Sequence, residues 1–252
     1  PFFYKLENGI PRPILFAGGA ALILYGAVVL VPWLAVRDHR RKPTGGSIAP
    51  APQSGVPWSR IALFTLLGLG FMLAELSLLA HFYLLLGSPT LAMAAALSGL
   101  LGWAGLGSWI GRGWHPQSPE RRIRSAGLVL FFCLLAYAAL LPWAVSRLAL
   151  LADGWRWCGG VLLLMPLGVS AGIPFPAALQ WLKARGKEDD IPWMYAVNGV
   201  SSVAGSALAL LLAMVLGFQQ AFLAGAACYL LVYFLMRTGG ERALQEVRID
   251  AG

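Results

Sequence analysis

The residue whose chemistry stands out most is Glu75, an acidic residue deep inside an otherwise apolar stretch, Phe71–Ser77. A carboxylate near the centre of a membrane helix costs about 2.5–3.5 kcal/mol on insertion scales, so another interaction must compensate for it. One interpretation is a proton relay, or a ligand for a cation or amine that faces a polar cavity. The other is a protonated or hydrogen-bonded glutamic acid that holds two helices together. Both interpretations remain open from the sequence.

Two further polar residues are candidates for the same site, His81 and Asn198. His81 follows Glu75 by six residues, so on a helix it points about 120° away from Glu75 and lies about 9 Å further along the axis. A lone histidine can titrate near neutral pH, but it is more often a hydrogen-bonded structural residue. Asn198 lies in a later apolar stretch, where a buried amide needs partners, and we expect Glu75 to be one of them.

Small residues recur at three- and four-residue spacing in two apolar stretches. The earlier stretch contains Gly102, Gly107 and Gly111, of which the last two have the GxxxG spacing, and the later one contains Ser202, Gly205 and Ser206. Small side chains allow the backbones of neighbouring membrane helices to approach closely. The spacing therefore predicts helix-packing faces rather than ligand grooves.

Signatures of soluble enzymes are missing from the sequence. It contains no phosphate-binding glycine loop after a strand, no HExxH and no paired CxxC motif. Cys133, Cys158 and Cys228 are widely spaced within apolar stretches and are predicted to be small hydrophobic residues rather than zinc ligands or disulfide partners. We therefore expect no metal site and no bound cofactor.

The elements that must position these residues follow from composition. The 252 residues are 58% hydrophobic and 12% charged, and the mean hydropathy is +0.70. Soluble domains are about 25% charged, so a soluble enzyme is excluded. The apolar stretches are continuous rather than alternating, which predicts an all-α, polytopic transmembrane helix bundle and not a barrel.

We predict seven membrane-spanning helices. The fifth is the weakest, because it is short, contains Pro166 and ends in Gly172–Pro176. Residues 177–185, which follow it, are predicted either as a short interfacial helix or as the continuation of the helix after a kink. The predicted spans are 13–36, 60–86, 89–111, 125–146, 155–172, 193–216 and 218–237.

The positive charges predict an orientation. The chain has a formal net charge of +8, and alternation over seven spans places most Lys and Arg residues on one side. The positive-inside rule makes that side cytoplasmic, with the N-terminus outside and the C-terminus inside. The basic excess is thus explained by topology and by attraction to anionic membrane lipids, and we expect no nucleic-acid partner.

Four regions follow from these spans. Residues 1–37 are an extracellular lead-in and the first transmembrane helix, and residues 38–58 are a cytoplasmic linker rich in Pro, Gly and Ser. Residues 59–238 form a six-helix transmembrane core, and residues 239–252 form a cytoplasmic tail. The acidic run Glu188–Asp190 is predicted to be a solvated loop, or a site for a polyamine or a partner protein.

Several segments resemble the membrane region of bacterial spermidine-synthase-like integral membrane proteins, which are similar to polyamine aminopropyltransferases. They are Pro1–Tyr4, Gly68–Glu75, Leu86–Thr90, Gly172–Pro176 and Pro192–Ser206. The resemblance implies that a soluble Rossmann-like domain accompanies such a membrane region, and that its nucleotide-binding residues lie outside this chain. Because the first residue is Pro1 rather than methionine, we expect the chain to be a piece of a longer protein.

These observations lead to three expectations about function. The first is a membrane domain of the inner (plasma) membrane that anchors an associated soluble domain and binds or conducts a small cationic molecule, with Glu75 neutralising the cation and Asn198 orienting it. The second is a non-catalytic scaffold subunit that packs against other membrane subunits. The third is a secondary transporter, against which the absence of an evident inverted repeat counts.

Overall fold

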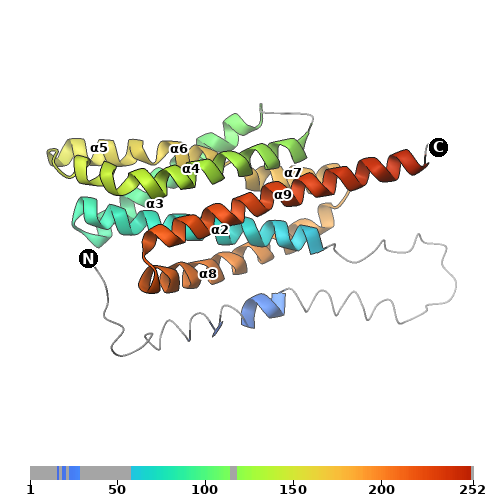
Figure 1. The fold of residues 1–252 in the computed structure, drawn as a ribbon, viewed down its shortest axis with the longest axis horizontal. Coiled ribbons are helices and arrows are strands. Elements are labelled where there is room, and N and C mark those ends of the chain that lie inside the picture. Colours follow the sequence, from blue (N-terminus) through green and yellow to red (C-terminus); the bar gives the residue numbers. More distant parts are fainter. Residues whose placement is uncertain (1–15, 17–18, 21–22, 29–57, 114–117, 251–252) are drawn as a thin grey trace.

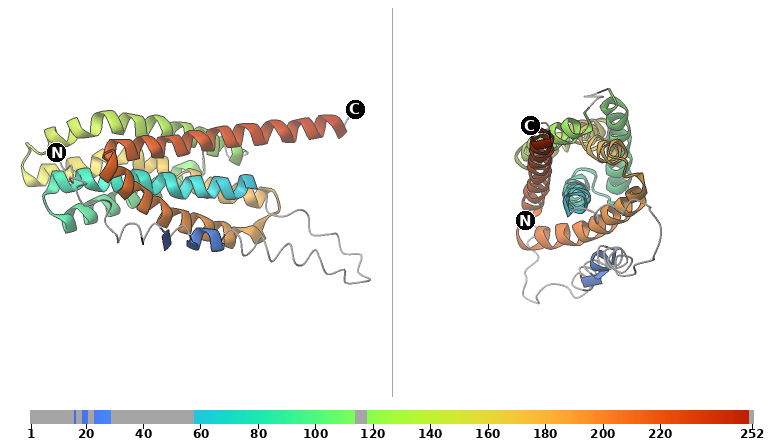
Figure 2. Two further views of the ribbon diagram at one scale, coloured as in Figure 1. Left: turned by 60° about the horizontal axis from the view of Figure 1, so that its bottom comes forward. Right: turned by 90° about the vertical axis from the view of Figure 1, so that its right-hand side faces the viewer.

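The structure is a computed structural model that describes residues 16, 19–20, 23–28, 58–113 and 118–250, with side chains described as far as residue 238. The described part of the chain is helical and contains no strand. Its helices run back and forth along one long axis, with α2 surrounded by the others (Figure 1 and Figure 2). The elements are α2 (Trp58–Leu86), α3 (Pro89–Gly111), α4 (Pro119–Leu148), α5 (Asp153–Leu163), α6 (Met165–Ala171), α7 (Pro174–Ala184), a short 3₁₀ turn η2 (Glu188–Asp190), α8 (Ile191–Val215) and α9 (Phe218–Asp250).

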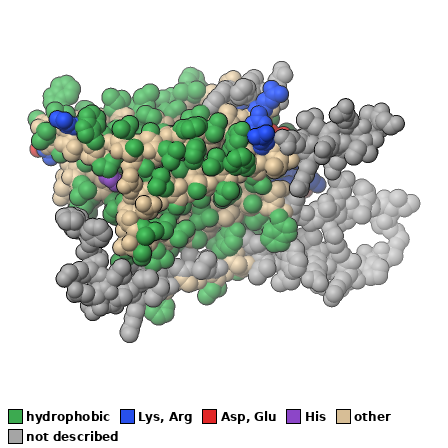
Figure 3. Space-filling view, viewed as in Figure 1, with side chains coloured by type: hydrophobic (Ala, Val, Ile, Leu, Met, Phe, Trp, Pro, Cys, Tyr) green, Lys and Arg blue, Asp and Glu red, His purple; other side chains and the backbone are tan. Residues whose placement is uncertain are grey.

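Six segments of the described chain are long and apolar enough to cross a membrane, which confirms an all-α bundle of a multi-pass membrane protein. One of these segments, Asp153–Ala184, consists of α5, α6 and α7 together. The helices alternate in direction, so nine of the eleven described Lys and Arg side chains between residues 58 and 238 fall at one end, which we call the basic end. Figure 3 shows this end, with apolar side chains covering the middle of the visible face.

Most of the predicted first span and all of the predicted linker except Trp58, the first residue of α2, lie outside the described residues. The longest described part of this span, residues 23–28, is helical and contacts α2 and α8. The hydroxyl groups of Tyr25 and Thr65 are 2.8 Å apart, and the Trp193 indole N–H donates to the Val28 carbonyl at 2.8 Å. These contacts attach this segment to the basic half of the bundle.

The fifth predicted span is longer than expected, because the chain continues to cross the bundle after Gly172. The backbone N–H of Ala177 still donates to the carbonyl of Ile173, and Ala178 and Leu182 are buried. The chain therefore continues as a helix after a kink, which is the second of the two predicted alternatives. The predicted tail is helical as far as it is described, since α9 continues to Asp250.

The break between α5 and α6 arises because Pro166 has no backbone N–H to donate to the preceding turn. Two side chains from other helices hydrogen-bond to the carbonyls around this break. The Trp103 indole N–H donates to the Val161 carbonyl at 2.8 Å, and the Tyr137 hydroxyl donates to the Leu163 carbonyl. Within a bilayer no water would take their place, so these bonds allow the break to occur at membrane depth.

Glycines permit the contact between α3 and α6. A Cβ on Gly107 would overlap the Val169 carbonyl, and a Cβ on Gly172 would overlap the Ala104 carbonyl. Gly111 contacts Ile173 across the same interface. The predicted GxxxG pair therefore lies in a close backbone contact, whereas Gly102 has open space around it and makes no such contact in the described bundle. The expected packing role of Gly102 is thus wrong within this chain, because the residue faces outward from α3.

We predict that Gly107→Ala destabilises the bundle by about 1–3 kcal/mol, because the added methyl group must push two backbones apart. The measurement is thermal unfolding in detergent. Gly102→Ala is the matched control on the same helix and should leave the melting temperature unchanged or slightly higher, since alanine favours helices. Equal effects of the two substitutions would contradict the observed contact.

The predicted orientation can be tested with single cysteines in a variant whose native cysteines are replaced by alanine. Arg121 is exposed near the start of α4 at the basic end, and Leu150, which is 78% exposed, follows α4 at the opposite end. A membrane-impermeant maleimide should label Leu150→Cys in intact cells and Arg121→Cys only after permeabilisation. The reverse pattern would place the basic end outside.

Candidate functional site

Glu75 lies near the middle of α2, 17 residues after its first residue and 11 before its last. The side chain is half-buried, and its Oε2 atom is buried with no hydrogen-bond partner among the described residues. Such an atom lacks both the hydration of water and the compensation of a protein donor. Glu75 is therefore a site at which a proton or a cation would relieve an unfavourable burial.

Asn198 does not provide the expected partner. Its backbone carbonyl would be 2.5 Å from a Cβ on Gly68, so it contacts α2 two turns before Glu75. Seven residues of helix correspond to about 10 Å, which is beyond hydrogen-bond reach. The expected pairing of Glu75 with Asn198 is thus wrong, because the crossing of α2 and α8 brings a different part of α2 against Asn198.

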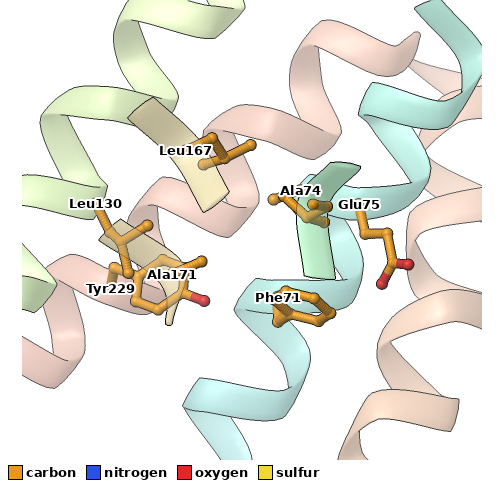
Figure 4. Close-up of a pocket in the computed structure, with 8 residues that line it drawn as sticks. Phe71, Ala74, Glu75, Leu130, Leu167, Ala171 and Tyr229 are labelled. Carbon is orange, nitrogen blue, oxygen red and sulfur yellow. The ribbon is translucent and has the colours of Figure 1, made fainter. Parts of the chain in front are cut away.

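A small cavity of about 10 Å³ adjoins Glu75 on the inner side of α2. This volume can accommodate about one water molecule. Apart from Glu75 and Tyr229 its wall is apolar, and the Glu75 carboxylate points away from Leu130, Leu167 and Tyr229 in Figure 4. The cavity therefore does not surround the carboxylate with polar groups, and it is too small to hold a ligand larger than a water molecule.

Helical geometry shows which side the carboxylate faces. Glu75 lies on the same face of α2 as Gly68, seven residues before it, and Leu79, four residues after it. Gly68 faces α8, and Leu79 lines a larger groove together with residues of α3 and α8. Glu75 thus lies on the side of α2 where α3 and α8 border it.

His81 occupies a different face of α2, as its spacing predicted. Its Nδ1 atom is 2.7 Å from the Ser77 carbonyl, and its ring contacts Phe218 and Phe222 of α9 at centroid distances of 6.4 and 5.9 Å. Because a carbonyl only accepts, Nδ1 must carry a proton. His81 is therefore hydrogen-bonded and packed between α2 and α9, which agrees with the structural interpretation of this residue.

The serines of α8 form hydrogen bonds within their own helix. Ser202 donates to the Asn198 carbonyl at 2.9 Å, and Ser206 donates to the Val203 carbonyl at 2.8 Å. Gly205 lies against Leu69 and Met72, where a Cβ would come within about 3.1 Å of both. This stripe therefore places α8 close to α2, and its hydroxyl groups are already bonded.

Ion pairs at the basic end are a feature that the sequence did not indicate. Arg60 of α2 pairs with Asp190 at 2.7 Å, and Glu120 of α4 pairs with Arg185 at 2.5 Å. The Trp181 indole also donates to Glu120 at 2.9 Å. One member of the acidic run is thus engaged within the chain, while Glu188 and Asp189 remain exposed. The partners are 61 to 130 residues apart in the chain. No local sequence pattern could therefore have predicted these contacts.

Among the described residues no group of His, Cys, Asp or Glu side chains is arranged to hold a metal ion. The chain matches no family model, no curated protein and no solved structure.

We predict that a double-mutant cycle between Glu75→Gln and Asn198→Ala gives a coupling free energy near zero in thermal or denaturant unfolding. Hydrogen bonds between membrane helices contribute about 0.6–2 kcal/mol, and residues without contact are additive within about 0.5 kcal/mol. A coupling above 1 kcal/mol would show that the two side chains meet.

Proposed function

We propose that this chain is a membrane domain that binds a small cationic molecule at Glu75 for an associated soluble domain. The observation that supports the proposal is the buried, unpartnered Oε2 atom in the middle of a membrane-spanning helix. A charged carboxylate in this position has an unfavourable transfer free energy into the membrane unless it is neutralised. A bound cation would supply both the opposite charge and the missing hydrogen-bond donor.

The expected orientation suggests which membrane surface the basic end faces, and the family resemblance suggests the class of cation. If the basic end faces the cytoplasm, its arginines and lysines lie next to the anionic surface of the inner (plasma) membrane. An associated soluble Rossmann-like domain would meet the membrane domain at one of its two ends. A polyamine is the cation that the resemblance implies, since aminopropyltransferases act on amines.

A second candidate function is that of a scaffold subunit in a larger membrane complex. Gly102 and Gly105 of α3 and Gly199 of α8 have open space around them in the described bundle. Small residues that face outward allow another membrane helix to approach closely. This function needs no ligand at Glu75 and is therefore separable by experiment.

The test is the binding of radiolabelled spermidine to the purified protein in lipid nanodiscs. Glu75→Gln should weaken binding by about 10- to 100-fold, because hydrogen bonds to a charged group contribute about 1.5–3 kcal/mol. Glu120→Gln is the matched control, since it removes the same charge from the basic end, where Glu120 pairs with Arg185. It should leave the affinity unchanged within about twofold.

Saturable binding that persists in Glu75→Gln would place the cation elsewhere, and an absence of saturable binding by the unmodified protein would exclude spermidine as the cation. In the scaffold alternative, neither variant changes binding, and outward-facing substitutions such as Gly102→Leu release a co-purifying subunit.

A further inference from the structure

A groove of about 330 Å³ lies between α3 and α8, with α2 as its floor. Its wall includes Tyr83 of α2, Met93 of α3 and Leu210 of α8, which are 42%, 49% and 42% exposed. All lining side chains are apolar except for the hydroxyl of Tyr83. The groove is therefore suited to an alkyl chain and not to a hydrated ion.

Figure 2 shows that α8 is inclined relative to α2, and the groove lies beside the part of α8 that contains Ala209 and Leu210. Near the basic end the Tyr195 ring of α8 packs on Phe175 of α7 at a centroid distance of 5.0 Å. Towards the opposite end Ala209 of α8 clusters with Leu73 of α2 and Ala221 of α9. As α8 moves from α7 to α9, it leaves an opening beside α3 that is occupied by no described helix.

Glu75 does not line the groove itself, but it immediately precedes the first groove residue of α2, Leu76. Leu76 and Leu79, the first lining residues along α2, are one and four residues after it, so Leu79 is about 6 Å further along the helix. Glu75 and Leu79 share one face of α2. The groove floor from Leu76 to Tyr83 is about 10 Å long and leads away from the carboxylate towards the non-basic end of the bundle.

We propose that the groove holds the alkyl chain of an amphiphilic amine whose ammonium group lies at Glu75. This inference rests on the proposed function and specifies its ligand as a cation with a short apolar tail that enters sideways from the membrane. The charge complements the unpartnered carboxylate oxygen, and the tail complements the apolar wall. The membrane already dissolves the tail, so affinity comes mainly from the charge, and the groove determines which amines fit.

The experiment is photolabelling in phosphatidylcholine nanodiscs with a diazirine-bearing octylammonium probe, followed by mass spectrometry of the labelled peptides. We expect label on the α2 segment 76–83 and the α3 segment 89–93. Glu75→Gln should reduce this label at least fivefold. Ala80→Phe, which fills the groove from its floor, should reduce it by a similar factor without lowering spermidine binding to the same extent.

Ala139→Phe is the matched control, since Ala139 is exposed on α4 far along the chain from the groove. It should leave the labelling unchanged, and thermal unfolding of all three variants establishes that they are folded. An octanol probe with the same diazirine provides the control for charge. It should label the groove weakly and equally in the unmodified protein and in Glu75→Gln.

Two outcomes would overturn the inference. If the octanol probe labels the groove as strongly as the ammonium probe, the groove holds ordinary acyl chains. If Ala80→Phe leaves octylammonium labelling unchanged while Glu75→Gln abolishes spermidine binding, the cation site exists without the groove, and only this inference fails. If Glu75→Gln leaves spermidine binding intact, the proposed function itself fails.

Discussion

The hydrocarbon of a bilayer offers no hydrogen-bonding partner, so polar atoms of a spanning helix must be paired within the protein. This constraint accounts for most polar contacts in the bundle. Serines donate to carbonyls of their own helix, as Ser77 does to Leu73 at 2.8 Å. Where Pro166 interrupts a helix, Trp103 and Tyr137 donate to nearby carbonyls. Among the described residues three buried side-chain atoms depart from this pattern, and Oε2 of Glu75 is the one that lies in the middle of a helix, whereas Nε of Arg60 and Nε of Arg156 lie near helix ends.

Glycine contacts determine the arrangement in which that exception occurs. Gly107 and Gly172 bring α3 and α6 into backbone contact, while Gly68 and Gly205 do the same for α2 and α8. Since α8 is held near α7 at one end and near α9 at the other, it cannot also run alongside α3. Close packing in two places therefore leaves an opening in a third, and the lining of this opening on α2 begins at Leu76, the residue after Glu75.

The predictions for individual residues succeeded where the signal is local and failed where it depends on helix crossing. His81 was placed on a different face from Glu75 by helical periodicity alone, and it lies there. The pairing of Glu75 with Asn198 required the register of α2 against α8, which the sequence does not encode in any local pattern. Likewise, the GxxxG spacing correctly identified Gly107 and Gly111 as helix-packing residues. Gly102 lies in the same glycine-rich stretch but faces outward.

The sequence by itself determined that the chain forms apolar helices, where most of them begin and end, and that one carboxyl group lies deep among apolar residues. These properties depend on composition and on periodicity along a single helix, which a linear sequence contains directly. Only the tertiary structure decided that α5, α6 and α7 cross the bundle as one broken helix, and which face of each helix is covered. It also decided that an apolar groove opens between α3 and α8, beginning one residue after Glu75 along α2, because crossing angles depend on contacts between residues far apart in the chain.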